Sequence, residues 1–225
     1  MAIRLGSVNP NAFRVGTQSP SRIFLGDKQV WPEFTEVRQQ ITTAGSYTFN
    51  IPAGCLFIDV ILLGGGGGGQ GMGSATAWGQ GGWAGSWGIW TLRRGIDIPW
   101  STTQITGVVG AGGTAGPGFS LSGTGAGGAG GNTTAVATGW AGTHVANGGA
   151  GGNNRNLDTT GKSPGTQTVN GINYVGGAEA FNAVGGSAAG NIYGGGGQAA
   201  MISIGFFGNA GGAGARGTAW FRAYT

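Results

Sequence analysis

The chain of 225 residues is rich in glycine and poor in charge. Charged residues make up 8%, about a third of the usual globular share. Hydrophobic residues make up 39%, which excludes a highly charged disordered tail. Glycine accounts for 55 positions, of which five precede Gly64 and none follow Gly217. The chain therefore divides into a conventional N-terminal part, a glycine-dominated body and a short conventional C-terminal end.

The charge pattern and the rare reactive residues exclude several kinds of site. The net charge is +4, but only Arg93 and Arg94 are adjacent, so no basic stripe for nucleic acid is predicted. Cys55 is the single cysteine and His144 the single histidine, which excludes disulfides within the chain and predicts no metal site or cofactor. The start lacks the apolar core of a signal peptide and no apolar run reaches about 18 residues, so we expect synthesis in a cytoplasm and no membrane insertion.

The first 35 residues contain a ten-residue repeat. Residues 3–6, 13–16 and 23–26 share the order apolar, any residue, apolar, glycine, and Asn9-Pro10 and Ser19-Pro20 between them are turn signals. Three such short strands bury little surface alone, so residues 1–35 are predicted to form a small β head that docks onto another protein. A strand layer packed on the main body is the alternative. The predicted docking residues are the apolar ones: Ile3, Leu5, Phe13, Val15, Ile23, Leu25 and Trp31.

The remaining residues, 36–225, are predicted to form an all-β, sandwich-like body. Nothing reads as a long amphipathic helix, and glycine at this density disfavours one. Residues 132–147 and 153–174 match no motif and are predicted to be loops. Strands are predicted where apolar residues alternate or run together, at 47–51, 56–63, 89–98, 103–109 and 218–224.

Within the body, glycines recur at every third position. Gly79, Gly82, Gly85 and Gly88 follow this spacing, as do Gly205, Gly208, Gly211, Gly214 and Gly217. A polyglycine-II helix has three residues per turn, so this spacing gives a stripe without side chains along which neighbouring helices can pack. We expect a bundle of such helices with loops, in segments 64–88, 107–131, 148–152 and 185–217. A disordered linker is the alternative, but eight tryptophans and ten phenylalanines weigh against it.

Aromatic side chains are the candidate binding residues. Exposed aromatic faces suit sugar rings or an apolar cell-envelope lipid, whereas the alternative is packing against strands or another subunit. Packing is expected for Trp90 and Trp220, which lie on predicted strands. The predicted receptor surface comprises Trp78, Trp83, Trp87, His144, Tyr174, Phe206 and Phe207.

Enzymatic chemistry is not predicted. Gly161-Lys162-Ser163 ends like a phosphate-binding loop, but Asn156 stands where the upstream glycine is required. Glycoside hydrolysis needs two facing carboxylates, and Asp97, Asp158 and Glu179 are far apart in the sequence.

Three stretches resemble a known family. Residues 45–54 followed by an apolar strand into Gly64–Gly69, together with the closing residues 211–221, look like phage glycine-rich tail domains. Residues 23–32 are similar to the starts of minor tail proteins of phages that infect actinobacteria, mycobacteriophages included. The resemblance implies a homotrimeric virion component of the distal tail, with other tail proteins as partners of the head.

The expected function is therefore a structural tail-tip protein whose loops meet a host cell-envelope glycan or glycolipid. A tail plug or spacer without receptor binding is the first alternative. A cell-wall hydrolase and an ice-binding glycine-rich protein are the others.

Overall fold

A computed structural model describes residues 34–72, 79–118, 125–153, 158–182, 187–201 and 208–225. Before residue 34 it describes residues 15, 17, 20, 22–26 and 28–31. These residues form strands and extended segments without any helix, which confirms the all-β prediction. Among them there is accordingly no helix long and apolar enough to cross a membrane.

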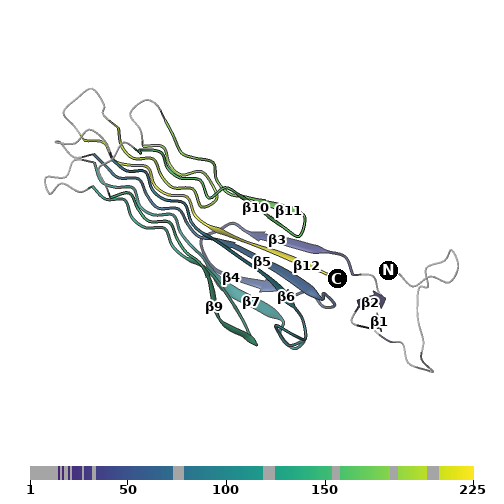
Figure 1. Cartoon of the computed structure of the whole chain (residues 1–225). Coiled ribbons are helices and arrows are strands. Elements are labelled where there is room, and N and C mark those ends of the chain that lie inside the picture. Colours follow the sequence, from purple (N-terminus) through teal and green to yellow (C-terminus); the bar gives the residue numbers. More distant parts are fainter. Residues whose placement is uncertain are drawn as a thin grey trace.

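Two four-stranded antiparallel sheets make up the body (Figure 1). The order in the first is β3-β12-β5-β6, and in the second β4-β7-β8-β9. The first sheet consists of β3 (Val37–Ile41), β12 (Thr218–Tyr224), β5 (Phe57–Leu63) and β6 (Trp87–Arg93). The second consists of β4 (Gly45–Asn50), β7 (Gln104–Val109), β8 (Thr133–Ala137) and β9 (Trp140–Ala146). Two short hairpins complete the strands: β1 (Ile23–Leu25) with β2 (Lys28–Trp31), and β10 (Thr166–Val169) with β11 (Ile172–Val175).

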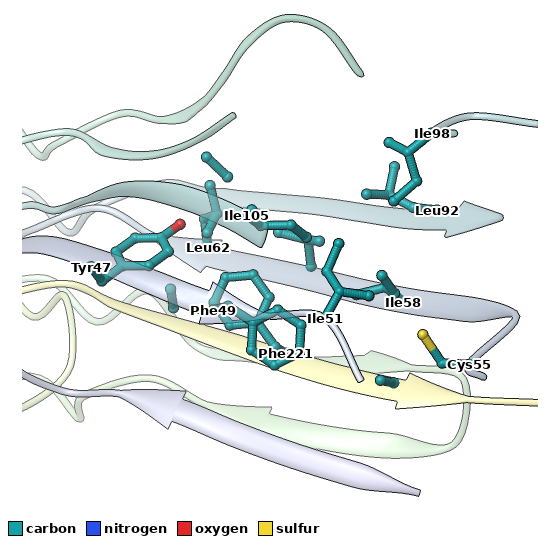
Figure 2. Close-up of a cluster of buried hydrophobic side chains, with 14 of the residues drawn as sticks. Tyr47, Phe49, Ile51, Cys55, Ile58, Leu62, Leu92, Ile98, Ile105 and Phe221 are labelled. Carbon is teal, nitrogen blue, oxygen red and sulfur yellow. The ribbon is translucent and has the colours of Figure 1, made fainter. Parts of the chain in front are cut away.

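The core lies between the two large sheets and is built by alternation along the strands. On β12, Ala219, Phe221 and Ala223 are buried, whereas Trp220 and Arg222 between them are half-buried on the outer face. Phe221 stacks on Phe49 of β4 with ring centroids 4.4 Å apart (Figure 2). The body is thus a sandwich held together by apolar side chains, as the alternating pattern predicted.

The predicted loops are wrong in two places. Residues 132–147 contain the β8–β9 hairpin, and residues 153–174 contain β10 and most of β11. The predicted glycine segments also extended too far, because β6 begins at Trp87 and β7 continues to Val109. In the predicted loops and at the ends of the predicted glycine segments alike, residues adjacent to glycine pair with another strand.

A central segment, residues 64–72, organises the glycine-rich part. Each of its amides donates to a neighbouring segment, and every third amide donates to the same one: the first to 79–86, the next to 125–132 and the third to 208–217. Gly64, Gly67 and Gln70, for example, donate to the first neighbour at N···O distances of 3.1, 2.8 and 2.9 Å. The period of three is the one that a polyglycine-II helix requires.

The carbonyl groups of the central segment follow the same rule. Every third carbonyl accepts from the same segment, and the three donors are 110–118, 147–153 and 194–201. These three run in the same direction as the central segment, whereas the three acceptors run in the opposite direction. The central segment therefore has three plus three neighbours, and its backbone is hydrogen-bonded to all six.

This close approach explains the glycine run. A methyl group on Gly67 would lie 2.0 Å from the carbonyl oxygen of Ala150, and one on Gly66 would lie 2.0 Å from that of Gly195. Such distances are far inside van der Waals contact, so only glycine fits at these positions.

The glycine-rich part, termed the bundle below, has two different ends. At one end its segments continue directly into strands: β5 ends at Leu63 before Gly64, and β12 begins at Thr218 after Gly217. β6, β7, β8 and β9 join the bundle in the same way. Figure 1 shows the segments continuing the direction of the strands, away from the sandwich. The opposite end of the bundle is termed the distal end.

Candidate functional site

The described residues that border five connections between bundle segments lie together at the distal end. The chain reaches this end and leaves it again five times, after Met72, Gly118, Asn153, Asn182 and Met201. Hydrogen bonds hold the bordering residues side by side: Gly71 donates to Gly125 at 2.7 Å, and Met72 donates to Asn209 at 2.8 Å. Sequence segments more than a hundred residues apart therefore meet in one place.

Buried glutamines fix the borders of these connections. Gln198 is fully buried, and its Oε1 accepts hydrogen bonds from the amides of Asn182 (2.8 Å) and Ala188 (3.2 Å). Its Nε2 donates to the carbonyl of Asn182 at 3.1 Å. Gln70 and Gln80 are also buried, and Gln80 Oε1 accepts from the amide of Asn153 at 3.3 Å. The prediction missed these residues, although a single glutamine after each of the glycine runs 64–69 and 194–197 was a visible signal.

Trp83 lies on the outside of the bundle. Its backbone belongs to the hydrogen-bond network of the bundle, since its amide donates to Ala150 at 2.9 Å and its carbonyl accepts from Gly67 at 2.8 Å. Its side chain is 48% exposed, so Trp83 has the surface position expected of a binding residue.

Trp87 and Tyr174 are not surface residues of the bundle, contrary to the prediction. Trp87 begins β6, stacks on Trp220 with centroids 5.5 Å apart and donates from Nε1 to the carbonyl of Pro164 at 2.8 Å. Tyr174 lies on β11, is 6% exposed and packs edge-on against Trp220. Their role is to seat the β10–β11 hairpin on the first sheet.

His144 lies on β9 and not in a loop. Its ring stacks on Trp140 with centroids 3.5 Å apart and meets the edge of Trp90. Its Nε2 is buried and has no hydrogen-bond partner in the described part of the chain, and burial lowers the pKa of its imidazole. The expected packing of Trp90 and Trp220 is confirmed, since Trp90 contacts the core and Trp220 the aromatic group around Trp87.

The remaining candidates divide between described and undescribed residues. Ile23 and Leu25 lie on β1, Ile23 pairs with Trp31 of β2, and Leu25 and Val15 are 66% and 74% exposed. Their exposure agrees with the docking surface predicted for the head. Six candidates lie outside the described residues: Ile3, Leu5, Phe13, Trp78, Phe206 and Phe207.

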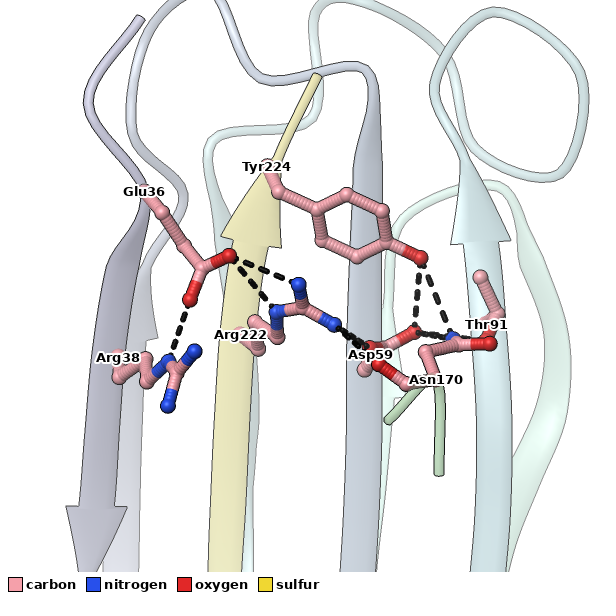
Figure 3. A network of polar contacts seen from close by, with 7 residues as sticks. All are labelled: Glu36, Arg38, Asp59, Thr91, Asn170, Arg222 and Tyr224. Carbon is pink, nitrogen blue, oxygen red and sulfur yellow. Dashed lines mark hydrogen bonds and ion pairs between the residues drawn. The ribbon is translucent and has the colours of Figure 1, made fainter. Parts of the chain in front are cut away.

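A polar network crosses the outer face of the first sheet (Figure 3). Asp59 is fully buried, and its Oδ1 accepts from Thr91 (2.7 Å), Asn170 (2.8 Å) and Tyr224 (3.2 Å). Burial beside this carboxylate raises the pKa of Tyr224 to about 12, so its hydroxyl stays protonated and donates. Asn170 is the turn residue of the β10–β11 hairpin, so the network joins the hairpin to β5, β6 and β12.

Ion pairs extend the network to β3. Arg222 lies 2.8 Å from the carboxylate of Glu36 and 3.6 Å from that of Asp59, and Glu36 also pairs with Arg38. Hydrogen bonds from Arg222, and then from Arg38, lower the pKa of Glu36. The two cations and two carboxylates alternate, so their formal charges cancel.

Asp97 and Asp158, two of the three carboxylates considered for hydrolysis, do not form a pair. Asp97 accepts from the amide of Arg93 at 2.7 Å, in the turn that follows β6. Asp158 pairs with Lys162 at 2.6 Å, and its carbonyl accepts from Gly81 in the bundle. They therefore lie at opposite ends of the molecule. Among the described residues no cluster of three or more metal-binding side chains occurs.

Comparison with known proteins agrees with the resemblance. The chain is 59% identical over 205 residues to the Gene 32 protein of Mycobacterium phage D29, which covers 90% of each chain. It is 56% identical over 203 residues to the Gene 32 protein of Mycobacterium phage L5, covering 90% of this chain and 89% of the relative. Residues 42–224 match the glycine-rich domain family. The chain belongs to the glycine-rich domain family, and proteins of mycobacteriophages are among its relatives.

Proposed function

We propose that this protein is a structural component of a phage tail tip, in which the bundle presents its distal connections to the host cell. The observation that carries the proposal is that the described residues bordering these five connections lie at one end of the bundle, opposite the sandwich. The similarity to mycobacteriophage proteins supports a phage context.

The bundle suits presentation because it is a stiff spacer. At about 3.1 Å per residue, the central segment, residues 64–72, spans roughly 28 Å between the sandwich and the distal end. Its backbone groups are hydrogen-bonded in all directions, so the segments cannot slide without breaking many bonds together. Connections held by a rigid scaffold are where binding residues concentrate in proteins generally.

The head provides the attachment in this proposal. The β1–β2 hairpin exposes Phe24 and Leu25, and Val15 before it is also exposed. An exposed apolar surface on a small hairpin is typical of a segment that docks onto a partner. We propose other tail proteins as that partner and three copies of the chain as the assembled state.

Immunogold electron microscopy tests the location. Antibodies against the purified chain should label the distal tail of a phage that encodes it. Label on the capsid or elsewhere along the tail, or none on intact particles, would refute the proposal.

Cell binding tests the presentation. Fluorescently labelled protein should bind selectively to mycobacteria in a panel of bacteria. Replacing Phe181, which is 58% exposed beside Asn182 at the border of a distal connection, by serine should abolish binding. Ile96→Ser is the matched control, since Ile96 is 68% exposed at the opposite pole of the sandwich. If a natively assembled protein that labels the tail binds no cells, the plug or spacer replaces the receptor-binding role.

A further inference from the structure

A groove opens on the outer face of the first sheet, beside its edge strand. The volume of this groove is about 320 Å³, which lies in the range of small-ligand sites. β3 forms one wall, the β10–β11 hairpin forms the other, and β12 forms the floor. Its lining includes Gln40 and Arg38 of β3, Ile172 and Asn173 of the hairpin, and Trp220 of β12.

The floor is aromatic. Trp220 is half-buried and in contact with three rings: Trp87 stacks on it, and Tyr174 and Tyr193 meet it at steep angles. Trp220 lines the groove and Trp87 does not. The surface of the Trp220 indole that faces the groove is therefore not covered by Trp87. An indole fixed in this way offers a flat apolar surface without further loss of side-chain entropy.

The wall formed by β3 carries an amide side chain with an open acceptor. Gln40 donates from Nε2 to Thr218 at 3.3 Å, which leaves its Oε1 as an acceptor. Asn173 also lines the groove, but its side chain lies on the face of the hairpin opposite to Tyr174, where Oδ1 accepts from Thr168 at 2.7 Å. A hydroxyl group can donate to the Oε1 of Gln40, so this wall complements a polyol.

The electrostatics of the groove favour an uncharged ligand. Arg38 is the charged residue of the lining, and its guanidinium pairs with Glu36. Glu36 is held by Arg222, which in turn faces Asp59. Because these four charges cancel, the groove does not present the surplus cation that a sugar acid or phosphate would need.

We infer that this groove binds a neutral saccharide, with a sugar ring against Trp220 and a hydroxyl group on Gln40. The groove lies beside the sandwich, roughly 28 Å or more behind the distal end of the bundle. A ligand that reaches it while the distal end meets a cell must be an extended chain, so the natural ligand is a polysaccharide. This last step rests on the proposed function, whereas binding of the saccharide itself does not.

Isothermal titration calorimetry with the purified full chain in its native assembly tests the inference. The probes are the neutral oligosaccharides mannotriose, maltotriose and arabinotriose, with trigalacturonate as the charged comparison. At least one neutral probe should bind, and trigalacturonate should bind more weakly. Gln40→Ala should weaken binding about three- to tenfold, as expected for the loss of one hydrogen bond.

The matched control is Gln104→Ala. Gln104 is an exposed glutamine on the second sheet whose Nε2 also donates to a side chain, Asn50, at 3.0 Å. Its replacement should leave affinity unchanged, and circular dichroism should show that all variants are folded.

Three results would overturn the inference: no neutral probe binds at millimolar concentration, trigalacturonate binds best, or Gln104→Ala weakens binding as much as Gln40→Ala. A fourth is that a β-strand peptide, and no saccharide, binds and protects the amides of Val37–Ile41 from exchange. The groove would then serve strand addition to β3. None of these results bears on whether the protein is located at the tail tip, which the labelling experiment decides separately.

Discussion

The sandwich and the bundle are stabilised in opposite ways. In the sandwich, side chains such as Phe49 and Phe221 fill the space between two sheets. In the bundle, the space between segments is too small for a side chain, and backbone amides and carbonyls make the contacts. The same strands enter both regions, so the change occurs within one residue, for example between Leu63 and Gly64. Tertiary structure can therefore be specified by the absence of side chains as well as by their packing.

The largest effect is expected from adding one methyl group at the centre of the bundle. In Gly67→Ala the new carbon would lie 2.0 Å from the Ala150 oxygen and 2.4 Å from its carbonyl carbon. Both are backbone atoms of a hydrogen-bonded neighbour, so the free energy of unfolding should fall by more than about 4 kcal/mol. Chemical denaturation measures this.

Gly131→Ala is the matched control in the same bundle. The nearest contacts of the new methyl group would be 3.0–3.4 Å, so the free energy of unfolding should fall by only about 1 kcal/mol. Equal, small effects for the two substitutions would mean that the bundle is not closely packed.

The sandwich should respond to removal of a side chain. Phe221→Ala deletes a ring that is 1% exposed and stacked on Phe49, at a cost of about 4 kcal/mol. Phe181 in the bundle is 58% exposed, and Phe181→Ala should change the free energy of unfolding by less than about 0.5 kcal/mol. The contrast between core and bundle fails if thermal or chemical unfolding gives similar losses for both.

The sequence predicts the sandwich better than the connections. Alternation in 47–51 and 218–224 identifies β4 and β12, because one face of each strand is buried and the other is not. The period of three identifies the glycine segments, but not which segment is central, since that depends on pairings between distant residues. The spacing of Gly85 and Gly88 predicts that Trp87 lies in the bundle, whereas its pairing with Leu63 places it in a sheet.

One missed element had a clear local signal. Asn170-Gly171 joins β10 to β11 with φ angles of 47° and 76°. An Asn-Gly pair between short alternating runs is the strongest short-range indication of a hairpin, because both residues accept positive φ. The groove, by contrast, could not be predicted, because its walls come from residues 38–40 and 172–174, which only the fold brings together.

Removing a buried amide should have an intermediate effect at the distal end. Gln198→Met keeps the length of the side chain but leaves two amides and one carbonyl at Asn182 and Ala188 without their partner. The expected loss is about 2–3 kcal/mol, measured by chemical denaturation. Gln104→Met, at an exposed glutamine, should have almost no effect. An equal loss of stability in the two variants would refute the role of Gln198 in fixing the borders of the connections.

A smaller effect is expected where the hairpin meets the sheet. Asn170→Gly retains the positive φ of the turn but removes the donor to Asp59 and Thr91, at a cost of about 1 kcal/mol. Asn170→Ala should cost more, since alanine also strains the turn. If both variants unfold at the wild-type temperature, the network does not anchor the hairpin.

The smallest expected effect is a pH dependence of stability, which arises from His144 in the sandwich. The pKa of His144 is lowered in the folded state, so the unfolded chain takes up a proton more readily. Stability is therefore full above the ordinary pKa of about 6.5 and declines as the pH falls through it toward the lowered value. The midpoint of thermal unfolding should drop slightly between pH 7.5 and 5.5, and His144→Gln should reduce that drop. A wild-type protein that gains stability over this range would contradict the burial of His144.

The central claim is that backbone hydrogen bonds hold the bundle together. Amide hydrogen exchange tests it most directly, because it reports on these hydrogen bonds residue by residue. Measured by nuclear magnetic resonance, the amides of Gly65–Gly69 should exchange as slowly as those of Ile58–Leu62 in β5, although no side chains cover them. Fast exchange throughout Gly65–Gly69 in a protein whose β5 amides are protected would contradict the hydrogen bonding of the central segment. The glycine-rich part would then be a flexible linker attached to a stable sandwich.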